Sequence, residues 1–227
     1  MENLQALWGN FRLSEEEDTA ITLENEATRE VQRKGELCLI GKIWMDRSIG
    51  KNIIEATMAK IWTLSKQAKF TEVGSNVFII SFANHADRGR VIEGRPWLFD
   101  KHIFVIDLFD GFTQPSSMKF DSAAMWVQLH NMPLVGINKE CGERIGRSLG
   151  EVEYVDVEED NVAWGSFLRL RVRMNLFKPL ARGRTTMLNG MKYWIPIQYE
   201  KLPRFCFDCG RILHEDGVCG MGQMVEE

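Results

Sequence analysis

The stretch KFTEVGSNVFIISFAN, residues 69–84, decides the fold, because two short strand-like runs lie on either side of the sequence Gly-Ser-Asn. Runs of this length with a turn at Gly74 to Asn76 between them are typical of two neighbouring strands. The segments on both sides of this pair show helix and strand patterns in turn. We therefore expect an α+β unit to be built around residues 69–84.

The flanking segments predict the order β-α-β-β-α-β. In the first helix, Ser48 is a plausible N-cap, and Ile54, Met58 and Ile61 share one helical face. The predicted segments are a strand at 36–45, a helix at 48–66, the two strands of 69–84, a helix at 85–97 and a strand at 101–109. This order is that of the ferredoxin-like, or RRM-like, βαββαβ fold, in which an antiparallel sheet carries both helices on one face.

RNA-recognition motifs read bases by stacking them on aromatic residues of the two central strands. Here Val77 and Ile79 occupy the places of those aromatics on one strand, and Cys38 occupies the matching place on the other. The sequence therefore predicts the fold without the RNA-reading sheet.

A second unit follows a Gly/Pro/Ser-rich link, DGFTQPSSMKFDS. Its helix is expected to end at Gly150, and its last two strands to turn at Asn189-Gly190. The predicted elements are a strand at 123–133, a helix at 138–150, strands at 151–159 and 166–176, and a hairpin at 184–200. No repeat of 20 to 50 residues is present.

The predicted domain boundaries of the whole chain are an acidic segment at 1–36, the RRM-like domain at 37–110, a linker at 111–123, a second small α+β unit with a basic strand and hairpin at 124–202, a knuckle at 203–219 and a tail at 220–227.

The charge of the chain is unevenly distributed. The net charge of -4 argues against a protein that coats nucleic acid indiscriminately. Residues 1–36 hold nine acidic and four basic residues, and we expect a solvated, partly disordered segment there, with SEEE as a possible start of a short helix. Residues 162–214 hold ten basic and two acidic residues, and this positive stretch continues into a Cys/His cluster.

The cluster CFDCGRILHEDGVC has the spacing C-x2-C-x4-H-x4-C, with Cys206, Cys209, His214 and Cys219 as ligands. This spacing predicts one tetrahedral Zn²⁺ site. Four protein ligands leave no open position, so the zinc is structural and does not activate water. The loop is too short to bury a core, so metal binding and folding of residues 203–219 should be one event, with Gly210 supplying the freedom that the wrapped loop needs.

Several segments together resemble a known family. They are GRPWLFDKHIFVIDLF, MWVQLHNMPL, RIGRSLGEVEYVDVE, FLRLRVRMNLFKPL and the knuckle after YEKLPRFC. The chain is similar to the plant domain of unknown function followed by a CCHC zinc knuckle that is found in LINE-type retrotransposon open reading frames and their relatives. The resemblance covers residues 37 to 219 and implies zinc-dependent, gag-like nucleic-acid binding. It also implies a nuclear location.

The resemblance carries over to this chain residue by residue. The four ligands and Gly210 match, and Phe207 holds the aromatic place after the first cysteine. Two positions depart from the family's pattern. Leu213 stands where a glycine usually precedes the histidine, and Glu215 and Asp216 follow the histidine where an apolar or basic residue is common.

The strand FLRLRVRM places three arginines on one face, since alternate residues of a strand point to the same side. Arg169, Arg171 and Arg173 could track the phosphates of an extended strand, or be neutralised by Glu151, Glu153 or Asp156 of the preceding strand, and the sequence leaves both interpretations open. The other candidate phosphate contacts are Arg182, Arg184, Lys201, Arg204 and Arg211.

These observations predict a zinc-binding, non-enzymatic protein that binds single-stranded RNA or DNA. The alternative is a zinc-stabilised module that binds another protein or itself. No P-loop, nucleophile elbow or polymerase carboxylate pair is present. Neither a signal peptide nor a membrane span is found, so we expect an intracellular protein, nuclear or cytoplasmic and not secreted. Trp97 and Trp126 are expected in the core, and His85, His102 and His130 are expected to be solvated or hydrogen-bonded.

Overall fold

The computed structural model describes residues 15–214 and 219 of the 227-residue chain. The predicted α+β class is confirmed, with two antiparallel sheets and a C-terminal knuckle region. Among the described residues, no helix has the length and apolar character needed to cross a membrane. The elements are α2 (Glu15–Asp18), α3 (Glu26–Gly35), β1 (Cys38–Ile43), α4 (Lys51–Trp62), β2 (Lys69–Gly74), β3 (Val77–Ser81), α5 (His85–Glu93), β4 (Trp97–Phe99), β5 (His102–Leu108), the 3-10 turn η1 (Pro115–Ser117), β6 (Ser122–His130), the 3-10 turn η2 (Leu134–Gly136), α6 (Lys139–Arg147), β7 (Glu151–Asp156), β8 (Phe167–Asn175), β9 (Gly183–Leu188) and β10 (Met191–Tyr199).

The first sheet has the strand order β2-β3-β1-β5-β4, and all its pairs are antiparallel. The two strands predicted in 69–84 are β2 and β3. The short strand β4, which pairs with β5, was not predicted, because three residues are too few for a visible alternation. The first helix, α4, begins after Gly50 and not after Ser48. Its buried face contains Trp62 together with Ile54 and Met58, whereas Ile61, which was expected on that face, is 44% exposed.

The helix-facing side of this sheet holds an apolar core. Trp62 lies between Phe70 and Phe104, with ring centroids 5.7 Å and 6.4 Å away. Most of the remaining members of the cluster come from α4, α5 and alternate positions of the strands, and they include Leu39, Ile43, Ile54, Met58, Phe78, Ile80, Val91 and Ile106. This pattern is that of an antiparallel sheet with helices on one face.

The second sheet has the order β7-β8-β6-β10-β9, which repeats the connectivity of the first sheet strand for strand. Helix α6 connects β6 to β7 as α4 connects β1 to β2. Gly146 lets α6 lie close to the sheet, since a Cβ there would be 2.7 Å from the Leu170 side chain. In the first sheet, α5 connects β3 to β4. In the second sheet, residues 176–182 make the corresponding connection between β8 and β9 without a helix.

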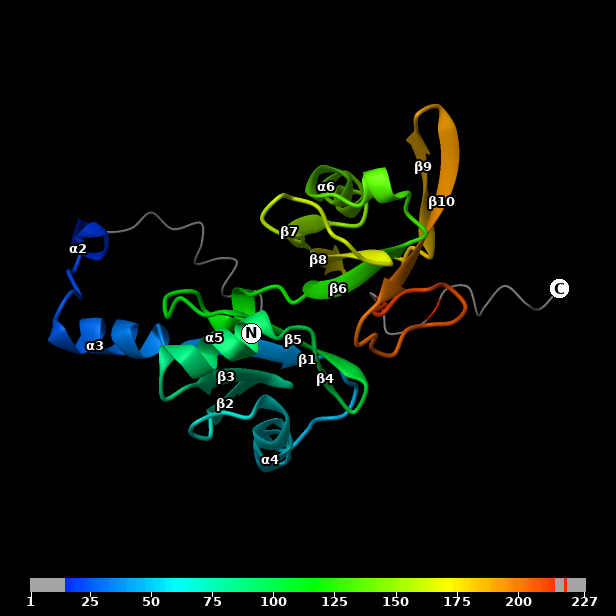
Figure 1. Cartoon of the computed structure of the whole chain (residues 1–227). Coiled ribbons are helices and arrows are strands. Elements are labelled where there is room, and N and C mark those ends of the chain that lie inside the picture. Colours follow the sequence, from blue (N-terminus) through cyan, green and yellow to red (C-terminus); the bar gives the residue numbers. More distant parts are fainter. Residues whose placement is uncertain (1–14, 215–218, 220–227) are drawn as a thin grey trace.

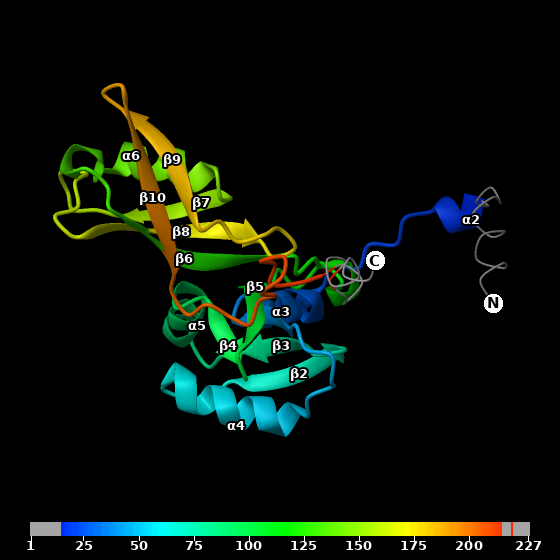
Figure 2. The ribbon, with the colours of Figure 1, turned by 90° about the vertical axis from the view of Figure 1, so that its right-hand side faces the viewer.

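The two sheets are stacked, with α4 and α6 on the outer sides (Figures 1 and 2). Ile40, Ile103 and Val105, on the side of the first sheet away from its helices, belong to one core cluster with residues of the second sheet. Val77 and Ile79, at the positions of RNA-stacking aromatics, are partly buried against the same cluster. The second unit therefore covers the face with which an RNA-recognition motif would read bases.

The acidic N-terminal segment contains more order than the sequence predicts. Helix α3 begins after Asn25, whose side chain accepts a hydrogen bond from the Thr28 N–H at 2.9 Å, while Thr28 Oγ1 accepts one from the Asn25 N–H at 2.9 Å. This reciprocal capping box uses Asn and Thr in place of the more familiar Ser and Glu. The segment SEEE starts at Ser14, outside the described residues, and its three glutamates begin the four-residue helix α2.

Asn76 fixes the loop that follows β1. It is 2% exposed and adopts a positive φ of 54°. Its side chain donates to the carbonyls of Met45 and Arg47 at 3.0 Å and 2.9 Å and accepts from the Ile49 N–H at 2.9 Å. Every polar atom of this buried amide is therefore used to hold residues 45–49 against the sheet.

We predict that Asn76→Ala lowers the free energy of unfolding by about 2 to 4 kcal/mol, because it leaves buried backbone groups without partners at a left-handed position. Urea denaturation monitored by tryptophan fluorescence measures the change. Asn52→Ala, on the exposed side of α4, is the matched control and should change stability by no more than about 0.5 kcal/mol. Equal effects of the two substitutions would contradict this account of Asn76.

Candidate metal centre and nucleic-acid interface

Four side chains at the C-terminal end converge on one point. The ligand atoms of Cys206, Cys209, His214 and Cys219 all lie within 4.8 Å of one another. The Cys209 Sγ and His214 Nε2 atoms are 3.1 Å apart. Ligands of a tetrahedral zinc are separated by roughly 3.5 to 4 Å, so the four atoms fit such an ion. The four residues are positioned to bind one metal ion, consistent with a single structural zinc.

The loop between the first two ligands is a tight turn. The Gly210 N–H donates to the Cys206 carbonyl at 2.8 Å, and the Cys206 N–H donates to the Arg211 carbonyl at 2.8 Å. Gly210 has a φ of 74°, a conformation that favours glycine, as its place after Cys209 predicts. The turn therefore aims two sulfurs at one point without strain at that residue.

The cluster needs a metal ion to hold its thiolates together. The hydrogen bond from the Arg211 backbone N–H lowers the pKa of Cys209. Burial and the neighbouring thiols of Cys206 and Cys219 raise this pKa by more, so its net shift is upward. A zinc ion would displace the thiol protons and neutralise the repulsion between the sulfurs. With four protein ligands, such an ion has no open position for water or substrate.

The knuckle is docked onto both units of the protein. Its Gly210 carbonyl accepts from the Leu180 N–H at 2.9 Å, and its Leu213 N–H donates to the Leu176 carbonyl at 3.0 Å. The Arg204 N–H, at the start of the knuckle, donates to the Lys101 carbonyl of the first unit at 2.8 Å. Leu213, which replaces the usual glycine, packs against the core that the two sheets share. That departure from the family's pattern is therefore part of the docking contact.

Three of the predicted nucleic-acid contacts are accessible on the knuckle. Phe207 is 90% exposed and contacts Phe205, with ring centroids 4.8 Å apart. Arg204 and Arg211 are exposed, and neither forms an ion pair with any residue that the structure describes. Glu215 and Asp216 lie outside the described residues.

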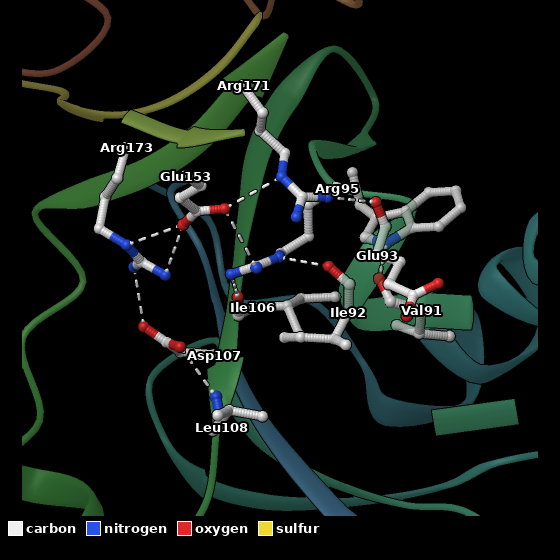
Figure 3. Close-up of polar contacts among 11 residues, drawn as sticks. Val91, Ile92, Glu93, Arg95, Ile106, Asp107, Leu108, Glu153, Arg171 and Arg173 are labelled. Carbon is white, nitrogen blue, oxygen red and sulfur yellow. Dashed lines mark hydrogen bonds and ion pairs between the residues drawn. The ribbon is translucent and has the colours of Figure 1, made fainter. Parts of the chain in front are cut away.

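Two arginines of β8, Arg171 and Arg173, lie where the two units meet and are neutralised by Glu153 of β7 and Asp107 of β5 (Figure 3). Glu153 contacts Arg171 Nε at 3.1 Å and Arg173 NH2 at 3.1 Å, and it lies 3.7 Å from Arg95 NH2. Arg173 also contacts Asp107 of β5 at 3.0 Å. Burial lowers the pKa of Arg95, although Glu153 opposes this shift. These arginines therefore connect the two sheets.

Arg169 is also engaged within the protein. Its guanidinium contacts both oxygens of Glu200, at 2.8 Å and 2.9 Å, and Asp156 at 3.3 Å. It lies 3.6 Å from the centre of the Trp126 ring. The hydrogen bonds from Arg169, joined by one from Gln128, lower the pKa of Glu200. Of the acidic partners anticipated on β7, Glu153 and Asp156 are used, whereas Glu200 and Asp107 lie too far away in sequence for strand alternation to identify them.

The other basic candidates divide into two groups. Lys201 donates to the Gly94 carbonyl at the end of α5 at 3.1 Å and lies 4.8 Å from the Trp97 ring centre. Arg184 donates to the hydroxyl and the carbonyl of Ser148 at the end of α6. Both residues thus cap helices. Arg182 is exposed and forms no ion pair within the described part of the chain.

Comparisons with known proteins identify the same two parts. Residues 32–116 match the model of a domain of unknown function (DUF4283), and residues 170–221 match the model of a zinc knuckle. An Arabidopsis thaliana protein described as uncharacterized is 24% identical over 135 residues, which are 59% of this chain and 42% of that relative. The match thus spans less than half of the relative's length. The predicted combination of a plant domain of unknown function with a CCHC knuckle is confirmed.

We predict that the purified chain holds one zinc ion and that Cys206→Ser abolishes this binding, because three ligands cannot close the tetrahedron. Elemental analysis after dialysis against a weak chelator measures the metal content. Cys141→Ser, on α6 and outside the cluster, is the control and should keep a full equivalent. Retention of a full equivalent by Cys206→Ser would show that Cys206 is not a ligand.

A second prediction concerns the partly buried carboxylate of Glu153 between the sheets. Glu153→Gln leaves Arg95, Arg171 and Arg173 near one another without their shared anion, and should lower the free energy of unfolding by about 2 to 4 kcal/mol. Glu151→Gln is the matched control, since Glu151 lies on the same strand, is exposed and forms no ion pair with the described residues. Chemical denaturation of both variants checks the difference. A Glu153→Gln protein as stable as the control would mean that the cluster does not hold the sheets together.

Proposed function

We propose that the protein is a non-enzymatic, zinc-stabilised binder of single-stranded RNA or DNA, and that the knuckle is its contact surface. The observation that carries the proposal is the exposure of Phe207. A phenylalanine that is 90% exposed beside a metal-stabilised loop provides an open face for stacking a base, worth about 1 to 3 kcal/mol per base. Arg204 and Arg211 flank it and supply charge for the phosphates.

The row of arginines on β8 is not part of this proposed surface. Arg169, Arg171 and Arg173 already contact Glu153, Asp156, Glu200 and Asp107. Breaking these ion pairs to bind phosphate would leave the partly buried carboxylates of Glu153 and Glu200 without their partners, which is costly. Lys201 and Arg184 are likewise engaged, so of the contacts predicted from the sequence, Phe207, Arg204, Arg211 and Arg182 remain in the proposal.

We further propose that the first unit has the ferredoxin-like fold. The order β2-β3-β1-β5, with α4 and α5 as the two crossover helices, supports this assignment, and β4 adds an edge strand. The open face of this sheet is covered, so base recognition in the manner of RNA-recognition motifs is not proposed for it.

The origin and location of the protein are also proposals. The family resemblance supports descent from a LINE-type retrotransposon and work in the nucleus or cytoplasm. The closed ligand set supports a role without catalysis, because a fully coordinated zinc has no site at which to activate water.

One observation favours a second candidate function, the binding of another protein. The β9–β10 hairpin extends from the second sheet (Figure 1), and Met187, Met191 and Trp194 are each more than half exposed on it. Exposed apolar side chains gathered on one projecting element are typical of protein interaction sites. In this alternative, zinc stabilises the module and affinity for nucleic acid is small.

We predict that the zinc-loaded protein binds a labelled single-stranded RNA or DNA, and that binding weakens steeply between about 50 and about 200 mM salt. Fluorescence anisotropy measures the affinity. Phe207→Ala should weaken it by about 5- to 100-fold, whereas Phe112→Ala, which removes a phenylalanine that is 74% exposed outside the knuckle, should not. Absence of binding at low salt by protein that holds one zinc would favour the protein-binding alternative.

A further inference from the structure

A cleft lies between the knuckle and the first unit. Its volume is about 590 Å³, within the range of sites for small organic groups. One wall comes from residues 42–46, 75–76 and 102–103, and the other from residues 204–207 and 212–214. Figures 1 and 2 show the orange and red segment of the knuckle beside the β4–β5 end of the first sheet. Segments that are 100 or more residues apart in sequence therefore form one hollow.

The cleft has aromatic walls. Phe205 and Phe207 line it from the knuckle, and Trp44 lines it from the end of β1. The Trp44 Nε1 donates to the Phe120 carbonyl at 2.8 Å, and its ring meets that of Phe177 edge-on at 5.8 Å, so the indole is fixed in place. Aromatic faces of this kind suit a planar, partly apolar group.

The charge in the cleft favours an anion. Lys42 lies 3.9 Å from the Trp44 ring centre, and among the described residues it has no carboxylate within ion-pair distance. Arg204 on the opposite wall is equally without an acidic partner there. Asp46 is the one carboxylate among the lining residues and is exposed at the rim. The lining thus holds two basic side chains, one on each wall, and one acidic side chain.

His102 adds a hydrogen-bonding group of defined direction. Its Nδ1 lies 2.9 Å from the Asp100 carbonyl oxygen, which can only accept, so Nδ1 carries the proton. The neutral ring then presents Nε2 as an acceptor, and Nε2 has no hydrogen-bond partner among the described residues. An N–H group on the edge of a nucleobase is a suitable donor to such an atom.

The cleft is formed before any ligand arrives. Asn76 holds the loop 45–49 of the first wall through three hydrogen bonds. The Arg204 N–H donates to the Lys101 carbonyl and ties the second wall to the first. A site with fixed walls loses less conformational entropy on binding than a mobile knuckle would.

We propose that this cleft, and not the knuckle alone, is the site for one unpaired nucleotide of the bound strand. The base stacks on Phe207 and meets His102 along its edge, and the phosphates adjoin Lys42 and Arg204. The inference rests on the proposed single-strand binding and assigns to the first unit a share in it. It names Lys42, Trp44 and His102 as binding residues, which no sequence pattern identifies.

The test uses the full, zinc-loaded chain and an eight-nucleotide single-stranded RNA. Lys42→Gln removes one charge from the wall formed by the first unit, and should weaken binding by about 3- to 10-fold and reduce the slope of affinity against salt by about one counterion. Lys60→Gln is the matched control, because Lys60 is exposed on the outer side of α4 and forms no ion pair with the described residues. Thermal denaturation and zinc content verify that both variants are folded.

Photocrosslinking gives an independent measurement on the wild-type chain. A bromouridine-substituted RNA should form adducts with peptides of both walls, one containing Phe207 and one containing Trp44 or His102. Adducts on the knuckle alone, together with wild-type affinity of Lys42→Gln, would overturn the composite site while leaving the proposed function intact. Absence of any binding by the wild-type chain would overturn both.

Discussion

Each sheet in this protein carries helices on one face, and the requirement to cover the other face governs the rest of the structure. In the first sheet the uncovered positions are apolar, with Ile40, Ile103 and Val105 among them. In the second sheet, one stripe of that face consists of Arg169, Arg171 and Arg173. Stacking the two units covers both the apolar face and the row of arginines. It is favourable only if the arginines are paired with carboxylates. Glu153 and Asp107 meet that condition at the point where β7, β8 and β5 come together.

This arrangement determines where the proposed nucleic-acid surface can lie. In an RNA-recognition motif the open face of the sheet binds RNA, but here the corresponding face of the first sheet is the interface between the two units. The second sheet repeats the connectivity of the first, yet the segment 176–182 replaces its second helix, and that segment supplies the backbone partners of the knuckle at Leu176 and Leu180. The knuckle is thereby held against the edge of the stacked sheets, beside the first unit and with Phe207 facing solvent.

The parts of this architecture that the sequence predicts are those that depend on local pattern. The pair of strands at 69–84 shows strand periodicity and a turn, and the metal ligands follow from spacing alone. The sequence could not show whether the arginines of β8 bind phosphates or carboxylates of the protein, because both alternatives are compatible with the same alternation of arginines and apolar residues along the strand. The ion pairs depend in part on contacts between distant segments, since no local sequence pattern identifies Glu200 and Asp107 as partners. The helix α3 was missed because residues 1–36 were interpreted from their acidic composition, although Asn25 is a common N-cap residue.

The basic residues of the chain also show why a count of charges is a poor guide to function here. Ten of them lie between 162 and 214, which suggests a broad nucleic-acid surface. Three of them, on β8, form ion pairs with carboxylates of the protein, and Lys201 and Arg184 cap helices, so each of these five already has a partner that would have to be replaced. Those with no acidic partner among the described residues include Arg204, Arg211 and, from outside that stretch, Lys42. Arg204 and Lys42 face each other across the cleft, and Arg211 lies on the same knuckle as Arg204. A chain with a net negative charge can therefore still present a small positive site, because the arginines of β8 are paired with carboxylates within the protein, whereas Lys42 and Arg204 have no acidic partner among the described residues.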